Sequence, residues 1–212
     1  MTFNTLAAVL DWLGIIVFAT TGALVASRKE MDIIGFIFLG TLTGIGGGTI
    51  RDTLLGAPVF WIINPAYLAV CVAVSAVTFF FAHIPQSRYR LLLWLDAIGM
   101  AVFAIIGAEK ALLMGAASMV AIAMGVITAT FGGIIRDIFG GESPVVFSRE
   151  IYVTAALAGA ALFVGLWMLD TAREVSMTVG VLTAAAIRFA ALRWNWSLPR
   201  YRPRPGRQTS GK

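Results

Sequence analysis

The sequence Gly-Gly-Gly-Thr-Ile-Arg-Asp at residues 46–52 returns as Phe-Gly-Gly-Ile-Ile-Arg-Asp at residues 131–137, which is 85 positions further along the chain. The same offset relates Asp-Trp-Leu-Gly at residues 11–14 to Asp-Ala-Ile-Gly at residues 96–99. Two separate motifs that keep one offset without a gap are not expected by chance. They indicate that the chain contains an internal duplication.

The composition places this duplication in a membrane. Of the 212 residues, 59% are hydrophobic and 13% are charged, whereas soluble domains carry about 25% charged residues. A soluble globular domain is therefore excluded. The net charge of +5 comes from basic residues beside the apolar stretches and near the C-terminus, where orientation signals and lipid headgroups account for it, so we expect no nucleic-acid partner.

Seven apolar stretches are long enough to cross a hydrocarbon core of about 30 Å as helices. We expect these spans at residues 5–26, 32–56, 60–82, 91–109, 112–139, 151–169 and 174–194. The predicted fold class is an all-α membrane protein with seven transmembrane helices.

The spans divide into two copies and one addition. We expect a single membrane domain over residues 1–198, with repeat one at about 5–82 and repeat two at about 91–169. Each repeat holds three spans, an odd number, so the second copy enters the membrane from the opposite side and the repeats are inverted. Such repeats commonly enclose a solute or ion site near the bilayer centre. The helix at 174–194 has no counterpart, and residues 199–212 form a basic tail rich in proline and arginine.

Basic residues are distributed unevenly between the two ends of the spans. One side receives Arg28, Lys29, Arg88, Arg90, Arg149, Arg193 and the basic residues of the tail. The opposite side receives only Lys110 and Arg173. Because positive charge collects on the cytoplasmic side, this bias predicts a cytoplasmic C-terminus and an N-terminus outside.

The glycine runs precede the charged residues at the same place in both copies. Each glycine costs about 1 kcal/mol relative to alanine inside a helix, so these runs predict a break or kink that frees backbone carbonyls near Arg51 and Arg136. The alternative is close packing, because small residues let membrane helices approach one another.

Inserting an arginine or an aspartate at membrane depth costs roughly 2.5 to 3.5 kcal/mol of free energy, so such side chains face protein or water. Neighbouring residues point about 100° apart on a helix, so we expect crossed pairing between the copies, with Arg51 near Asp137 or Arg136 near Asp52. The alternative is that both arginines snorkel to opposite surfaces.

Threonines on the same helices add hydroxyl groups, which either line a wet path or bond to carbonyls of the preceding turn. The candidate ion pathway consists of Thr43, Gly46, Gly47, Gly48, Arg51, Asp52, Thr128, Thr130, Gly132, Gly133, Arg136 and Asp137.

The remaining polar residues receive simpler interpretations. Asp11 and Asp96 are expected to cap helix N-termini or, alternatively, to line an aqueous vestibule. Arg188 is expected to snorkel, and Cys71 to be a buried apolar side chain. With one histidine and one cysteine, the chain cannot build the common catalytic or metal sites. We expect no enzyme, no cofactor and no resident metal.

The duplicated three-helix unit, the seventh helix and the paired glycine and Arg-Asp strings resemble the prokaryotic branch of the trimeric intracellular cation (TRIC) channels. The resemblance covers residues 5–194. It implies a homotrimer in the bacterial inner membrane, in which each subunit holds a potassium-permeable pore flanked by the second and fifth helices, bent at their glycines. The Lys-Glu-Val motif of the animal members, which is linked to phosphoinositide binding, is missing from this sequence.

Two functions are compatible with these features. The first is a channel for monovalent cations, potassium or sodium, in which carbonyl and hydroxyl oxygens replace part of the hydration shell of a transient cation near the glycines. The second is a secondary transporter for a small solute such as glycine, which inverted repeats and broken helices suit equally well. A structural or assembly role is a third interpretation.

Overall fold

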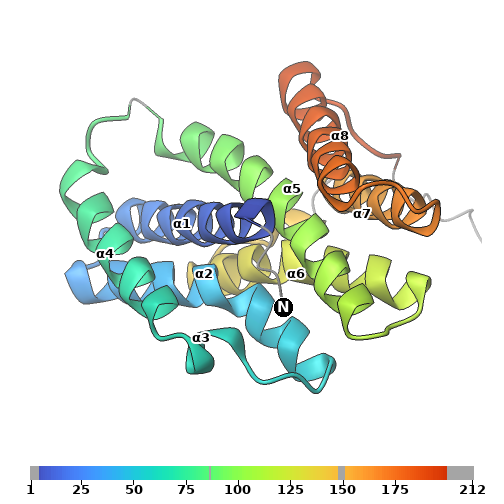
Figure 1. Cartoon of the computed structure of the whole chain (residues 1–212). Coiled ribbons are helices and arrows are strands. Elements are labelled where there is room, and N and C mark those ends of the chain that lie inside the picture. Colours follow the sequence, from blue (N-terminus) through green and yellow to red (C-terminus); the bar gives the residue numbers. More distant parts are fainter. Residues whose placement is uncertain (1–4, 86, 148–150, 200–212) are drawn as a thin grey trace, which may run out of the picture.

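The computed structural model describes residues 5–85, 87–147 and 151–199 (Figure 1). Its helices are α1 (Thr5–Arg28), α2 (Ile33–Leu54), α3 (Phe60–Ile63), α4 (Ala66–Phe81), α5 (Arg88–Leu113), α6 (Ser118–Phe139), α7 (Val153–Met168) and α8 (Arg173–Trp194), with the 3-10 helix η1 (Val145–Phe147) between α6 and α7. Arg149 and residues 200–212 of the predicted tail lie outside the described residues.

The all-helical prediction is confirmed, with one correction to the third span. Helices α1, α2, α5, α6 and α8 are long and apolar enough to cross a membrane, and α4 and α7 are shorter apolar helices of 16 residues. The predicted span at residues 60–82 is two helices, because α3 ends before Asn64 and α4 starts at Ala66. Pro65 between them has no backbone N–H to continue a helical ladder, and Asn64 Oδ1 accepts the N–H of Ala66 at 3.2 Å.

The first helices of the two repeats, α1 and α5, pack in a reciprocal way. The rings of Phe18 and Phe103, which are equivalent at the offset of 85, stack with centroids 5.2 Å apart. A Cβ atom on Gly14 would strike the ring of Phe103, and one on its equivalent Gly99 would lie 3.1 Å from the ring of Phe18. Since earlier residues of α1 meet later residues of α5 and the reverse also holds, the two helices run antiparallel about a pseudo-two-fold axis.

The second helices, α2 and α6, meet backbone to backbone in the same reciprocal way. A Cβ atom on Gly47 would strike the carbonyl oxygen of Thr128, and one on Gly132 would lie 2.7 Å from the carbonyl oxygen of Thr43. We call this contact the glycine seam. Both pairs are equivalent at the offset of 85, so α2 and α6 are also antiparallel and the repeats are inverted relative to each other.

The glycines of the seam lie within uninterrupted helices. Helix α2 continues from Ile33 to Leu54 and α6 from Ser118 to Phe139. An unwound turn at the glycines, one form of the predicted break, is therefore wrong for this structure. Close packing, the alternative interpretation, is what the glycines provide here, because a side chain at Gly47 or Gly132 would hold the two backbones apart.

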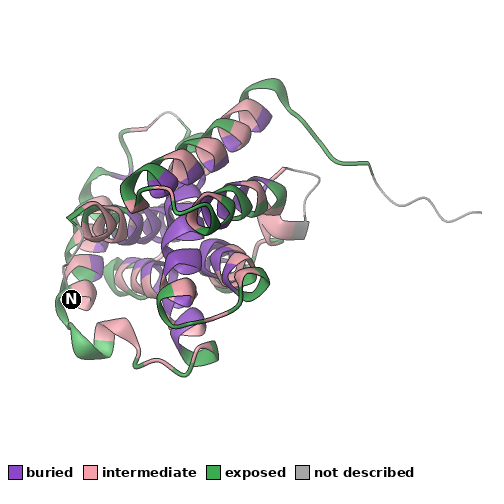
Figure 2. Cartoon of the chain, turned by 45° about the vertical axis from the view of Figure 1, so that its right-hand side comes forward, coloured by how far each residue is buried: buried purple, intermediate pink, exposed green. Residues whose placement is uncertain are grey.

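The burial pattern is that of a membrane protein. Buried residues gather where the helices meet at the centre, whereas the outward faces are exposed or intermediate (Figure 2). Many outward side chains are large and apolar, among them Ile34, Phe38, Val77, Phe80, Met119 and Leu182. Helix α8 packs on α5 and α7 beside the two repeats, and its approach to α7 uses Gly159, whose Cβ would lie 2.8 Å from the carbonyl oxygen of Gly180.

We predict that Gly47→Ala destabilises the protein, because the added methyl group forces the seam apart. Overpacking of this kind costs about 1–3 kcal/mol. The matched control is Gly165→Ala on α7, where a Cβ atom has no neighbour within 4 Å and alanine favours the helix by about 1 kcal/mol. Unfolding followed in detergent micelles measures both, and equal stability of the two variants would contradict the close approach at Gly47.

Two ionic clusters at the ends of the glycine seam

The Arg-Asp motifs form two ionic clusters, one at each end of the glycine seam. We call the residues around Asp52 at the end of α2 the first cluster, and those around Asp137 at the end of α6 the second cluster. Because α2 and α6 run antiparallel, these two helix ends lie at opposite ends of the seam. Each cluster draws side chains from both repeats.

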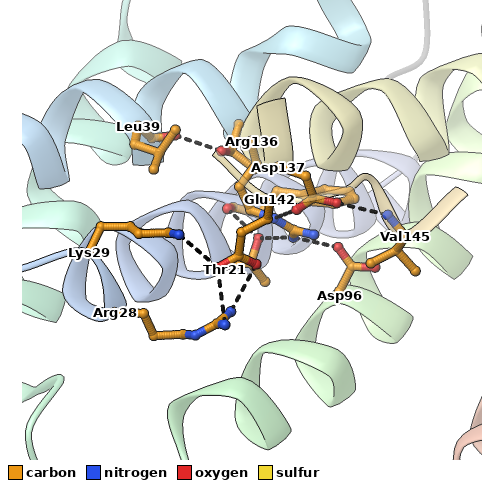
Figure 3. Close-up of polar contacts among 11 residues, drawn as sticks. Thr21, Arg28, Lys29, Leu39, Asp96, Arg136, Asp137, Glu142 and Val145 are labelled. Atoms are coloured by element: carbon orange, nitrogen blue, oxygen red, sulfur yellow. Dashed lines mark hydrogen bonds and ion pairs between the residues drawn. The ribbon is translucent and has the colours of Figure 1, made fainter. Parts of the chain in front are cut away.

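The second cluster is a buried network centred on Arg136 (Figure 3). The Nε atom of Arg136 lies 2.9 Å from Asp137 Oδ1, and its Nη1 atom lies 2.6 Å from Asp96 Oδ1 on α5. Nη1 also donates to Thr21 Oγ1 on α1 at 3.1 Å. The side chains of Arg136, Asp96 and Asp137 are 1%, 2% and 5% exposed. Such charge-assisted bonds in a water-poor site tie α1, α5 and α6 together.

The first cluster has the same plan but different partners. Asp52 Oδ1 lies 2.7 Å from Arg51 Nε and also 2.7 Å from Lys110 Nζ, at the end of α5. The side chain of Asp52 is fully buried, whereas that of Lys110 is 31% exposed. Nearby, the hydroxyl of Tyr67 donates to Asp11 Oδ2 at 2.5 Å.

Each motif carboxylate also holds the chain that follows its helix. Asp52 Oδ2 accepts the N–H of Phe60 at 3.0 Å, and Asp137 Oδ2 accepts the N–H of Val145 at 3.0 Å. Phe60 begins α3 and Val145 begins η1, and the two residues are equivalent at the offset of 85. The duplication thus preserves the hydrogen bonds as well as the sequence.

The predicted crossed pairing is wrong. Each arginine pairs with the aspartate that follows it, and Arg51 lies at the other end of the seam from Asp137. A side chain as long as arginine can turn its Nε back toward the next residue, which the 100° separation of the two Cα–Cβ directions does not prevent. Snorkelling is also wrong, because Arg51 and Arg136 are only 4% and 1% exposed.

The capping role expected of Asp11 and Asp96 is wrong as well. Asp11 lies inside α1, which begins at Thr5 as predicted. Asp96 lies inside α5, whose N-cap is Ser87 with a side chain that accepts from the N–H of Arg90. Asp96 instead pairs with Arg136, and Asp11 with Tyr67.

Sequence reasoning missed several members of the clusters. Tyr67 and Tyr152 are equivalent at the offset of 85, so a search of the sequence for further matches at this offset would have identified both residues. Lys110 was considered only as one of the basic residues that indicate the orientation in the membrane. The predicted snorkelling of Arg188 is wrong, because this residue is buried with its guanidinium carbon 5.0 Å from the centroid of the Tyr152 ring.

The threonines follow the simpler of the two interpretations. The hydroxyls of Thr43, Thr128 and Thr130 donate to carbonyls four residues earlier, at 2.6, 2.6 and 2.9 Å. The other predicted glycines surround the seam: a Cβ atom on Gly46 would lie 2.8 Å from Ile135, and one on Gly48 would lie 2.6 Å from the ring of Phe60.

A small pocket lies beside the second cluster. Its lining comprises Thr130, Gly133, Ile134, Arg136, Asp137, Val145, Val146 and Tyr152. The space between these atoms measures about 140 Å³, part of which is open to solvent. Among the described residues, no three histidine, cysteine or acidic side chains converge to hold a metal ion.

Three further ion pairs join parts of the chain outside the two clusters. Arg28 Nη2 lies 3.0 Å from Glu142 Oε1, with Lys29 Nζ 3.7 Å from the same oxygen (Figure 3). Arg173 Nε lies 2.5 Å from Glu109 Oε1 and connects α8 to α5. The basic side chains of these pairs are 28–36% exposed. The pairs with Glu142, which is itself 22% exposed, contribute little to stability, whereas Glu109 is only 5% exposed.

This architecture defines a class: a multi-pass, all-helical membrane protein built from two inverted three-helix repeats and one added helix. The profile of the family described as "Glycine transporter" matches residues 8–83 and again residues 93–168, so the chain belongs to this family. The two matches are themselves offset by 85 positions, which supports the duplication.

Relatives and solved structures agree with the assignment. The TRIC trimeric intracellular cation channel orthologue from Rhodobacter sphaeroides is 59% identical, with a TM-score of 0.89 over 91% of this chain and 100% of that chain. A UPF0126 membrane protein of Vibrio cholerae is 42% identical over 203 residues, which are 93% of this chain and 84% of that protein. The UPF0126 inner membrane protein YadS of Escherichia coli is 39% identical over 91% of this chain and 94% of its own length. The predicted resemblance to the prokaryotic TRIC channels is confirmed.

We predict that Arg136→Met lowers the free energy of unfolding by about 3–5 kcal/mol, because Asp96 and Asp137 are left as buried charges without their cation. The matched variant is Arg51→Met, whose effect is smaller because Lys110 remains 2.7 Å from Asp52. Unfolding in micelles of fixed composition compares the two. Losses of the same size would contradict the different partner sets of the clusters.

Proposed function

We propose that this protein is a channel for monovalent cations, with a pathway inside each subunit along the glycine seam. The observation that carries the proposal is the 59% identity to a TRIC channel orthologue over nearly the whole chain. The placement of a buried aspartate at each end of the seam supports it, because carboxylates near a narrow pathway attract cations. The protein is accordingly a homotrimer without enzymatic activity.

The chemistry of the seam suits a potassium-permeable pathway with weak selection over sodium. Asp52 and Asp137 attract cations, whereas Arg51 and Arg136 limit how many enter. Backbone carbonyls at Thr43 and Thr128 face a glycine across the seam, so bending of α2 and α6 at their glycines would expose these oxygens to a partly dehydrated ion. The ordered ring of carbonyls that gives potassium channels their strong selectivity has no counterpart in the sequence.

We place the protein in the bacterial inner membrane with its N-terminus outside and its C-terminus in the cytoplasm. Its relative YadS is named an inner membrane protein, and the excess of arginine and lysine after α1 and before α5 supports this orientation. The second cluster then lies toward the cytoplasm and the first cluster toward the outside.

The alternative is a secondary transporter of glycine, which the description of the family favours. Inverted repeats that meet at glycine-rich helices are also typical of carriers. In that case the two ends of the seam would open and close in turn. The carboxylates would bind the amino group of the substrate.

A recording from purified protein in planar bilayers separates these functions. We predict unitary potassium currents that Asp52→Asn and Asp137→Asn each reduce, because each change removes a carboxylate from one end of the pathway. Labelled glycine uptake in liposomes is measured in parallel. Saturable uptake of glycine with no unitary current would contradict the channel and support the transporter.

A further inference from the structure

Helix α8, which lies outside the two repeats, packs against α5 in an antiparallel register. The rings of Trp94 on α5 and Phe189 on α8 have centroids 5.2 Å apart. Further along α5, the Cδ1 atom of Ile105 would lie 2.7 Å from a Cβ atom on Gly180 of α8. Since the earlier residue of α5 meets the later residue of α8, the two helices run in opposite directions, and these contacts fix which residues face each other.

This register places Arg90 of α5 opposite Arg193 of α8. Arg90 lies four residues before Trp94, and Arg193 lies four residues after Phe189. Residues four apart lie on the same face of a helix, about one turn from each other. Both arginines are exposed. Two positive charges from different helices therefore meet one turn beyond the aromatic contact.

The described part of the chain offers this pair of arginines no acidic partner. At the other end of the same two helices, Arg173 of α8 is matched by Glu109 of α5. No acidic residue follows Glu174 in the sequence. Like charges at one place repel each other, so an anion from outside the chain would stabilise the pair. The ion pairs among the described residues all involve other cations, namely Arg28, Lys29, Arg51, Lys110, Arg136 and Arg173.

The surroundings of the pair indicate a lipid headgroup as this anion. Trp194 and Trp196 directly follow Arg193, are 64% and 48% exposed, and stack with ring centroids 5.7 Å apart. The left-handed Asn195 between them, with φ of 54°, turns the chain so that the two rings lie together. Exposed tryptophans at a helix end are typical of the membrane–water interface. The arginines therefore lie at the depth of the headgroups.

We propose that Arg90 and Arg193 together bind the phosphate of one anionic phospholipid, such as phosphatidylglycerol, in the cytoplasmic leaflet. Guanidinium groups bind phosphate oxygens in a bidentate way, and basic sites between transmembrane helices on the cytoplasmic side bind anionic headgroups. The partly exposed rings of Trp94 and Phe189 offer apolar surface to an acyl chain one turn deeper. The lipid thus joins α8 to the second repeat. This site goes beyond the proposed channel function and does not depend on it.

Lipid retention tests the proposal on the full-length protein. Native mass spectrometry measures which lipids stay bound when the protein is released from micelles that contain equal amounts of phosphatidylglycerol and phosphatidylcholine. We expect the wild type to retain phosphatidylglycerol preferentially. Arg90→Gln combined with Arg193→Gln should lower the ratio of the two bound lipids by roughly tenfold, the scale of one hydrogen bond to a charged group.

The matched control is Lys29→Gln combined with Lys212→Gln, which removes the same charge from other places on the predicted cytoplasmic side. This control should keep the wild-type ratio. An unchanged ratio in the arginine variant would overturn the site. Equal losses in both variants would also overturn it, because overall charge and not the facing pair would then attract the lipid.

A second measurement separates the lipid from other anions. A ligand that binds the folded protein stabilises it, so phosphatidylglycerol should raise the melting temperature of the wild type above its value in phosphatidylcholine, but not that of the arginine variant. Inorganic phosphate added to phosphatidylcholine micelles should not reproduce the increase. If it does, the ligand is a soluble anion and the lipid site is wrong. Loss of the wild-type oligomeric state by the arginine variant in phosphatidylcholine would identify a neighbouring copy as the occupant and would likewise overturn the proposal.

Discussion

The structure depends on the backbone contact between α2 and α6, where glycine of one repeat meets a threonine carbonyl of the other. Gly47 faces Thr128 and Gly132 faces Thr43, and any side chain at either glycine would separate the helices. Because the two contacts are equivalent, they can both form only when the helices run antiparallel. The same constraint sends the Arg-Asp ends of α2 and α6 in opposite directions, so one duplicated motif yields two separate clusters.

The clusters stabilise the two charges that each Arg-Asp motif places at the end of an apolar helix. Two charges at the end of an apolar helix are expensive away from water unless they are paired and hydrogen-bonded. Pairing within the motif satisfies part of this need, and the aspartate uses its second oxygen to hold the chain that follows. Different residues complete the pairing at the two ends. Asp96 and Thr21, both buried, complete the second cluster, whereas Lys110, whose side chain is 31% exposed, completes the first. The second cluster is therefore fully buried, whereas the first includes a lysine side chain that is 31% exposed.

The sequence predicted the duplication, the helical spans and the convergence of both glycine motifs, because these follow from local composition and from a constant offset. It did not predict which charges pair. The positions of Arg51 and Asp137 along an antiparallel crossing cannot be deduced from the repeat until the contact of Gly47 with Thr128 is known. Helix α5 also begins at Arg88, three residues before the start predicted at residue 91, so Asp96 lies inside the helix and not at its cap. The sequence predicts a continuous third span because the four large apolar residues of Phe60–Ile63 extend the apolar run up to Asn64, although Pro65 divides it.

The central claim is that cations cross each subunit beside the glycine seam. Its most direct test is a cysteine at Thr130, which lines the small pocket together with Arg136 and Asp137. The only native cysteine, Cys71, is replaced by serine in this variant. A positively charged thiol reagent should block the potassium current as the channels open, while modification of a cysteine at Ile138, which is 59% exposed, should leave it unchanged. Complete modification of the Thr130→Cys protein, verified by mass, with an undiminished current would contradict the account.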